Sequence, residues 1–199
     1  MIQLIFATNN AHKVEEIQLG IGNKISVISL RQAGIDIDIP EPYDTLEANA
    51  LEKAQTIYGM SKQNCFSEDT GLEVQALEGG PGVKSARYAG EEKNSDKNMD
   101  KLLITLSNEL NRKARFRTVI SLIFNENEYL FEGICDGQII GNKRGSNGFG
   151  YDAVFLPSGS NRTFAEMEMA EKNKFSHRKK AADKLVLFLQ EQIRLTRTT

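Results

Sequence analysis

The start of the chain places an apolar run, a polar loop and an amphipathic stretch one after the other. Residues 3–7 form a compact apolar run, which predicts a buried strand. The polar loop "TNNAHK" (8–13) follows it, and Val14, Ile17 and Ile21 then recur at helical spacing. The first predicted unit is therefore strand, polar loop and helix.

The remaining pattern mixes strands with helices. The predicted elements are a strand over 24–30, helices over 45–60, 94–110 and 176–193, and a strand hairpin of 116–124 and 129–140 joined by "NENE". We expect Ser95 and Ser176 to cap the last two helices, and we expect glycine-rich loops over 78–82 and 141–152. The stretch "SEDTGLEV" (67–74) predicts an acidic turn around Gly71 between two strand-like pieces. Helices and strands that alternate early, with a hairpin late, predict an α/β fold with a mixed central β-sheet flanked by helices.

Composition narrows the class of protein. A chain of 199 residues with 26% charged and 40% hydrophobic residues is typical of one globular domain over 1–199. The formal net charge of −2 does not favour binding to nucleic acid or to an acidic membrane. Cys65 and Cys135 form no CxxC motif, and the N-terminus has no basic leader, so we expect a cytoplasmic protein in a reducing compartment.

The loop at 8–13 is a candidate phosphate site. Thr8, Asn9 and Asn10 offer short polar side chains, and unpaired N–H groups at a helix N-terminus attract anions. Lys13 opposes the helix dipole there unless an anion binds beside it. The alternative is an ordinary capping loop with a solvent-exposed lysine.

Three carboxylates are candidates for metal binding and base catalysis. Glu41 lies in "PEPYD", and Glu68 and Asp69 are adjacent in "SEDTGLEV". Carboxylate oxygens beside phosphates suit Mg²⁺, and a carboxylate can also deprotonate an attacking water. Thr70 could donate to a phosphate. The alternative is that these residues belong to solvated acidic turns.

Two later segments could meet a nucleotide base. Phe149 and Tyr151 lie in the glycine-rich "GSNGFGYD", where an aromatic ring could stack on a planar base or simply fill the core. The basic stretch "EKNKFSHRKK" (171–180) brings His177 and Arg178 to the start of the last helix. Its alternative interpretation is a solvated basic face.

In this order, the segments resemble the inosine triphosphate pyrophosphatase family, the Ham1-like non-canonical purine nucleoside triphosphate pyrophosphatases. The resemblance spans nearly the whole chain through "FATNNAHKVEEI", "TLEANALEKA", "SEDTGLEVQALEGGPGVKSARYAGE", "GFGYDAVF" and "KNKFSHRKKA". Glu68, Thr70 and Tyr151 replace a commoner aspartate, serine and tryptophan with similar chemistry. Glu47 is displaced by one position from the glutamate usually next to Asn49, which leaves its place in the site open.

The resemblance implies two lobes with an active-site cleft between them, in a Mg²⁺-dependent homodimer. It implies cleavage of ITP, dITP and XTP to the monophosphate and pyrophosphate, with Asp69 as the catalytic residue that assists water and with Glu41 and Asp69 as metal ligands. The substrate-binding residues implied are Thr8, Asn9, Asn10, Ala11, His12, Lys13, Thr70, Phe149, Gly150, Tyr151, Asp152, Lys172, His177 and Arg178.

Two other functions fit parts of this pattern. A Maf-type nucleotide pyrophosphatase would also combine carboxylates with phosphate binding, but "SHR" and "GFGYD" disfavour it. A nucleotide-sensing or RNA-associated module could use the same phosphate loop, but it would gain nothing from carboxylates placed beside phosphates.

Overall fold

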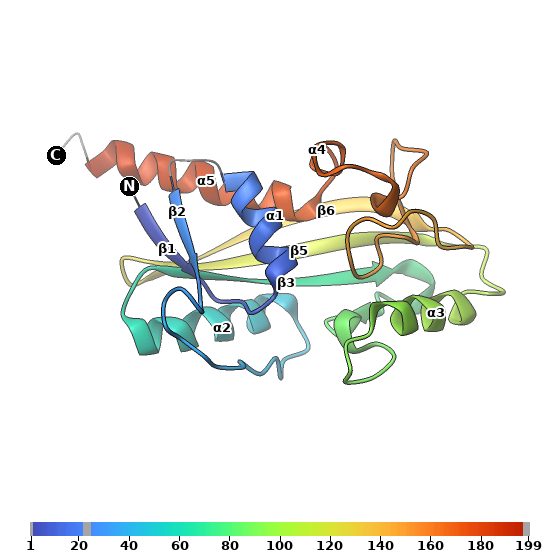
Figure 1. The fold of residues 1–199 in the computed structure, drawn as a ribbon, viewed down its shortest axis with the longest axis horizontal. Coiled ribbons are helices and arrows are strands. Elements are labelled where there is room, and N and C mark those ends of the chain that lie inside the picture. The colour runs from blue at the N-terminus through green and yellow to red at the C-terminus, as the bar shows by residue number, and fades with distance from the viewer. Residues whose placement is uncertain (1, 22–24, 197–199) are drawn as a thin grey trace. The chain divides into compact units, whose positions relative to one another are not determined.

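A computed structural model describes residues 2–21 and 25–196 (Figure 1). The elements, in chain order, are β1 (Ile2–Phe6), α1 (Ala11–Ile21), β2 (Ile25–Ser29), α2 (Leu46–Ser61), β3 (Cys65–Val74), β4 (Pro81–Gly82), α3 (Ser95–Thr105), β5 (Lys113–Phe124), β6 (Asn127–Ile139), β7 (Phe155–Pro157), α4 (Met169–Lys172) and α5 (His177–Thr196). The strands form one seven-stranded sheet in the order β2-β1-β3-β5-β6-β7, with β4 paired to β3. Because β1 pairs in parallel with β2 and β3, while β3–β4 and β6–β7 are antiparallel, the predicted mixed sheet is confirmed.

The chain divides into two compact units. Unit 1 comprises Met1–Asp69, Thr118–Gly133 and Arg178–Thr199, and unit 2 comprises Thr70–Arg117 and Ile134–His177. The boundaries fall within β3, β5 and β6 and at the start of α5, so neighbouring residues in one element can belong to different units. The cleft implied by the resemblance stays a prediction.

Unit 1 has helices on both faces of its strands. Figure 1 shows α1 and α5 on one face and α2 on the other. Successive residues of β1 pack against different faces: Leu4 packs with residues of α1 and α5, and Ile5 packs with residues of α2. Successive side chains of a strand point to opposite faces, so each strand contributes to both hydrophobic layers.

Unit 2 has a core rich in aromatic side chains. Phe116 of β5, Phe155 of β7 and Phe164 lie together, with the Phe116 and Phe155 ring centroids 4.6 Å apart. Leu102 of α3 is fully buried against them. The packing fixes the loops that follow β6 and β7.

The predicted turn in "SEDTGLEV" is wrong, because Cys65–Val74 is a single continuous strand. Gly71 is needed for close strand pairing instead: a Cβ there would lie 2.8 Å from the carbonyl oxygen of Gly82 in β4. Adjacent carboxylates are compatible with a strand when they point to opposite faces and each has a cation.

Two other boundaries differ from expectation. The helix predicted over 94–110 ends at Thr105, and its N-cap is Asn94 rather than Ser95, with the Asn94 side chain accepting from the Lys97 N–H. The hairpin is confirmed, but its turn is tighter than "NENE". Only Asn125 and Glu126 separate the strands, and both have positive φ, as a two-residue type I′ hairpin turn requires.

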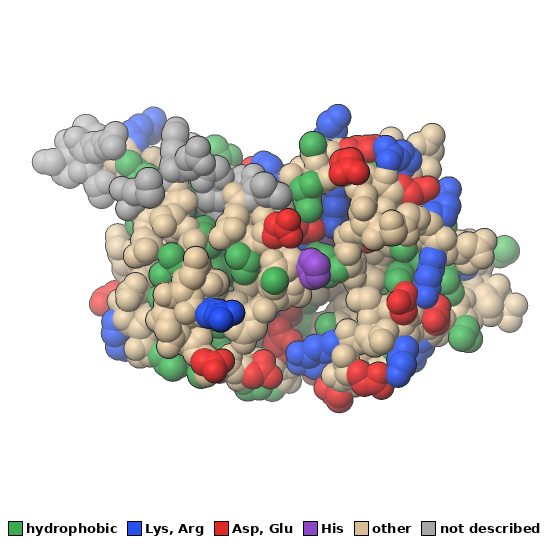
Figure 2. Space-filling view, viewed as in Figure 1, with side chains coloured by type: hydrophobic (Ala, Val, Ile, Leu, Met, Phe, Trp, Pro, Cys, Tyr) green, Lys and Arg blue, Asp and Glu red, His purple; other side chains and the backbone are tan. Residues whose placement is uncertain are grey.

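The surface is mixed in charge. On the face drawn in Figure 2, acidic and basic side chains are interspersed, in keeping with the formal net charge of −2. Among residues 2–21 and 25–196, no helix combines the length and the apolar composition needed to cross a bilayer.

Candidate active site

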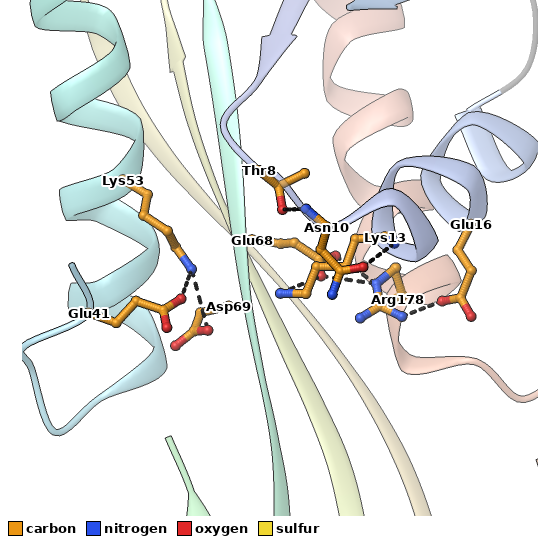
Figure 3. A network of polar contacts seen from close by, with 9 residues as sticks. All are labelled: Thr8, Asn10, Lys13, Glu16, Glu41, Lys53, Glu68, Asp69 and Arg178. Atoms are coloured by element: carbon orange, nitrogen blue, oxygen red, sulfur yellow. Dashed lines mark hydrogen bonds and ion pairs between the residues drawn. The ribbon is translucent and has the colours of Figure 1, made fainter. Parts of the chain in front are cut away.

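The adjacent carboxylates of β3, Glu68 and Asp69, serve different neighbours (Figure 3). Glu68 contacts Lys13 of α1 and Arg178 of α5. Asp69 contacts Lys53 of α2. The strand alternation that separates the two hydrophobic layers of unit 1 therefore also separates the two charges, which explains how they can lie side by side in sequence.

On the α1 and α5 face, Lys13, Glu16, Glu68 and Arg178 form what we call the Glu68 cluster. The Arg178 Nε donates to both Glu68 oxygens, at 3.0 and 2.8 Å, and its Nη1 donates to Glu16. The Lys13 Nζ lies 3.1 Å from Glu68 Oε1. Glu16 belongs to no site predicted from the sequence, and only its spacing one helical turn after Lys13 hinted at it.

The Glu68 cluster is deeply buried. Glu68 and Arg178 are 1% and 3% exposed. Burial by itself would raise the pKa of Glu68, but the charges and hydrogen bonds of Arg178 and Lys13 outweigh it and lower the pKa to about 2. Burial would also lower the pKa of Arg178, and the attraction of Glu68 and Glu16 raises it instead. Glu68 and Arg178 are therefore both charged at neutral pH and form a buried ion pair.

The polar loop before α1 is held by its own side chains. The Thr8 hydroxyl accepts from the Asn10 N–H at 3.2 Å, and Asn10 Oδ1 accepts from the Lys13 N–H at 3.2 Å. Asn9 donates to the Ile37 carbonyl at 2.8 Å. Ala11 and His12 are exposed in the first turn of α1. Asn10 therefore acts as an ordinary helix-capping residue. Lys13, by contrast, is not a solvent-exposed lysine, because its side chain is only 16% exposed.

On the α2 face, Glu41, Lys53 and Asp69 form the Asp69 cluster. The Lys53 Nζ lies 2.5 Å from Glu41 Oε1 and 3.4 Å from Asp69 Oδ1. Lys53 was not predicted as a site residue from the sequence, although its position after Ala50 and before Ala54 and Ile57 puts it on the buried face of α2. A lysine on an otherwise apolar helix face is the signal that could have identified it.

The segment that contains Glu41 is tied to α2 by Asn49. The Asn49 side chain accepts from the Tyr43 N–H and donates to the Tyr43 carbonyl, both at 2.9 Å. Asn49 is itself buried, at 1% exposure. This pairing fixes the chain two residues after Glu41, so Asn49 helps to hold the loop. A place for Glu47 in the site stays a prediction.

The Asp69 cluster fits a magnesium ion by the chemistry of its donors. Glu41 and Asp69 converge on one ammonium, so both carboxylates reach a common position for positive charge. Mg²⁺ is usually held by one or two carboxylates, with substrate phosphate and water supplying the remaining ligands. Among the described residues, no group of three or more His, Cys, Asp or Glu could hold a metal ion. Glu68 is committed to two cations on the other face of the strand and does not join this set.

Unit 2 holds a polar group of its own around Asp152. The Lys172 Nζ donates to Asp152 Oδ2 at 2.7 Å, and the Phe149 N–H donates to the same oxygen at 3.0 Å. The Lys172 Nζ also lies 5.5 Å from the centroid of the Phe149 ring. His177 stacks on Phe116 with centroids 4.8 Å apart. The structure therefore brings Phe149, Asp152 and Lys172 together, as the resemblance implies.

Three further predicted residues have distinct placements. Tyr151 is 3% exposed in the core of unit 2, and its hydroxyl donates to the Ser85 carbonyl at 2.8 Å, so the core-packing alternative describes its side chain. Gly150 has φ +65, and a Cβ built on it would meet no other atom within 4 Å. Thr70 follows Asp69 in β3 and is half-buried. Contacts of all three with a substrate stay predictions.

Comparisons with known proteins agree with this architecture. A sequence model of the Ham1 family matches residues 4–188. The dITP/XTP pyrophosphatases of Flavobacterium psychrophilum and Porphyromonas gingivalis are 48% and 50% identical to the chain; each match covers 95% of this chain, and 100% and 98% of the relative.

Solved structures give the same result. The Ham1 protein of Staphylococcus aureus superposes with a TM-score of 0.87 at 36% identity, covering 96% of this chain and 99% of that one. The HAM1 protein of Coxiella burnetii gives 0.88 at 34% identity, covering 96% and 100%. The resemblance found in the sequence is confirmed, and the chain belongs to the Ham1 family.

Proposed function

We propose that this protein hydrolyses dITP, ITP and XTP to the nucleoside monophosphate and pyrophosphate. The observation that supports the proposal most strongly is that the Glu68 and Asp69 side chains lie on opposite faces of β3. Glu68 contacts Lys13 and Arg178, whereas Asp69 lies on the other face with Glu41. The names of relatives such as those from Flavobacterium psychrophilum and Porphyromonas gingivalis support it.

The phosphates are assigned to residues of unit 1. The first turn of α1 offers backbone N–H groups and the positive end of the helix dipole. Lys13 has three donors on its ammonium, and its contact with Glu68 uses one of them. Lys53 adds a second buried cation, and it joins Lys13 as a phosphate contact in this proposal.

Asp69 is assigned the activation of water. Phosphoanhydride hydrolysis depends on charge neutralisation and on an aligned water more than on covalent catalysis. Asp69 can accept the proton of the attacking water, and its contact with Lys53 holds the carboxylate in one orientation. Glu41 and Asp69 would hold Mg²⁺, which when bound neutralises charge on the phosphate oxygens.

The base is assigned to residues of unit 2, with Arg178 added from unit 1 by the resemblance. The Phe149 ring offers a stacking surface. Lys172 and Arg178 have only donors, which suit the 6-oxo group of hypoxanthine and xanthine and oppose the 6-amino group of adenine. A site whose buried donors lose their acceptor can reject the wrong base by up to about 10⁴–10⁵-fold.

Two coarser features belong to the same proposal. The resemblance implies a homodimer, and the two buried, free cysteines support a cytoplasmic location in a reducing compartment. Size-exclusion chromatography with light scattering would test the dimer directly.

A nucleotide panel tests the proposed activity. Pyrophosphate and orthophosphate release are measured for ITP, dITP, XTP, GTP and ATP, each with Mg²⁺ and with chelator. We expect pyrophosphate as the first product from ITP, dITP and XTP, only with Mg²⁺. Orthophosphate as the first product would show that the bond cleaved has been misassigned, and equal rates on all five nucleotides would contradict the base selectivity.

A further inference from the structure

Gly148 lies where a side chain would collide with the Asp152 carboxylate. A Cβ built on Gly148 would lie 2.1 Å from Asp152 Oδ2 and 3.0 Å from its Cγ. Gly148 also has φ +76, which disfavours other residues. Gly159 provides a comparison in the same unit: its φ is +84, yet a Cβ built on it would have Phe175 Cε1 as its nearest neighbour, 4.0 Å away.

The Asp152 carboxylate cannot move aside at low cost. Its Oδ2 is the atom that accepts both from the Lys172 Nζ and from the Phe149 N–H. Asp152 is 5% exposed and Lys172 is 3% exposed, so water does not readily replace either contact. The Asp152 backbone is fixed as well, because its N–H donates to the Phe149 carbonyl and its carbonyl accepts from the Ala165 N–H.

One oxygen atom therefore joins two parts of the predicted base site. Through the Phe149 N–H it fixes the loop that holds the stacking ring. Through Lys172 it fixes the donor assigned to the 6-oxo group. The Lys172 Nζ lies between two aromatic rings, 5.5 Å from the centroid of Phe149 and 5.4 Å from that of Phe164, and cations at such distances are attracted to ring faces.

We propose that Gly148 is a positioning residue for base selectivity. By having no side chain, it leaves room for the Asp152 carboxylate to hold Lys172 and the Phe149 loop at the same time. The functional part of this inference rests on the proposed function. The structural part, the coupling of Gly148 to Asp152, can be measured without any substrate.

The coupling is tested by a double-mutant cycle on stability. The urea midpoint of unfolding is measured for wild type, Gly148→Ala, Asp152→Ala and the double variant, with Gly159→Ala as the control for positive φ. We expect Gly148→Ala to lower the midpoint clearly more than Gly159→Ala does. In the Asp152→Ala background, we expect Gly148→Ala to cost no more than Gly159→Ala costs in wild type, since the obstructing carboxylate is gone. An equal loss from Gly148→Ala in both backgrounds would overturn the proposal.

The role in selectivity is tested by kinetics. We expect Gly148→Ala to raise KM for ITP by about tenfold or more, the scale for disrupting a buried charged hydrogen bond. The ITP/ATP ratio of kcat/KM should fall too, whereas Gly159→Ala should keep the wild-type ratio. An unchanged ratio in Gly148→Ala would show that the glycine is merely structural.

A second variant keeps the test valid if Gly148→Ala does not fold. Asp152→Asn adds no atoms and removes the charge that holds Lys172, so it should also lower the ITP/ATP ratio; an unchanged ratio would contradict the proposal. A wild-type protein inactive on ITP would refute the proposed function, and the stability cycle would still decide whether Gly148 acts through Asp152.

Discussion

The polar groups of unit 1 and of unit 2 are built in different ways. In unit 1, Lys13, Lys53, Glu68 and Arg178 come from elements far apart in the sequence and form ion pairs on both faces of β3. In unit 2, Phe149 and Asp152 belong to one short loop, and their main partner, Lys172, lies only twenty residues further on.

The difference follows from what each group is proposed to bind. A triphosphate carries a large negative charge. While no substrate is bound, the cations that would bind it must be held in place and neutralised by carboxylates. A purine is planar and neutral, so it is recognised by a ring surface and a few oriented donors. We therefore expect charge changes in unit 1, apart from Arg178, to affect all nucleotides alike, and changes in unit 2 to alter the preference among bases.

The largest effect is expected at Asp69. Asp69→Asn keeps the shape but removes basicity and charge, so turnover on ITP should fall by about 10²-fold or more. No cavity forms, and Glu41 remains beside the Lys53 ammonium, so the urea midpoint should fall much less than for Arg178→Ala. The matched control is Asp100→Asn, an ion-paired surface aspartate with a side chain 59% exposed, for which we expect wild-type turnover. Wild-type-like turnover in Asp69→Asn would remove this residue from the mechanism.

Arg178 lies in unit 1 and contacts Glu16 and Glu68 there, whereas the resemblance implies that it binds the base. It therefore gives a sharper test of the comparison between the two units. Arg178→Ala leaves Glu16 and Glu68 without their shared buried cation, and the free energy of unfolding should drop by about 3–5 kcal/mol. We also expect the ITP/ATP ratio of kcat/KM to collapse, since a donor to the 6-oxo group is lost.

The control for Arg178 is Arg115→Ala, which breaks a half-exposed pair with Glu73. It should cost no more than about 1 kcal/mol. If Arg178→Ala lowers kcat/KM for ITP and ATP by the same factor, Arg178 only anchors Glu68 and does not recognise the base.

A smaller effect concerns acid stability. The pKa of Glu68 is lowered from 4.5 to about 2, because the attraction of Arg178 and Lys13 outweighs the effect of burial. A lowered pKa stabilises the folded state above the unfolded pKa, so this contribution is complete above about pH 4.5 and is lost as the pH falls toward 2. Urea midpoints between pH 5 and pH 2.5 should therefore fall less steeply for Glu68→Gln than for wild type.

The control for acid stability is Glu92→Gln, which removes an exposed partner of Lys97. Its pH slope should match that of wild type. If the urea midpoint of Glu68→Gln also falls with pH as steeply as that of wild type, Glu68 does not take up its proton in this range.

Local patterns in the sequence were enough for most elements. The apolar run of β1, the helical spacing of α2 and the alternating hairpin strands depend on neighbours within one element, so they could be predicted. β3 could not be predicted as one strand, because adjacent carboxylates and a glycine are typical of a turn. Whether that segment turns or continues depends on cations supplied from Lys13, Lys53 and Arg178.

The candidate site was predictable to the extent that it followed motifs. The resemblance identified Lys13, Asp69 and Lys172 by their sequence context. Partners far apart in the chain were out of reach: Arg178 lies 110 residues from Glu68 and 162 from Glu16. Lys53 was within reach, because a charged residue on the buried face of an amphipathic helix contradicts the pattern around it.

The ITP/ATP ratio of kcat/KM in two lysine variants tests the central claim most directly. Lys13→Ala removes a cation assigned to the phosphates, so it should lower kcat/KM for ITP and ATP by the same factor and leave the ratio unchanged. Lys172→Met keeps an unbranched apolar side chain one atom shorter and removes a donor assigned to the base, so it should lower kcat/KM for ITP far more than for ATP. A ratio that changes with Lys13→Ala and stays constant with Lys172→Met would contradict the assignment of phosphates to unit 1 and of the base to unit 2.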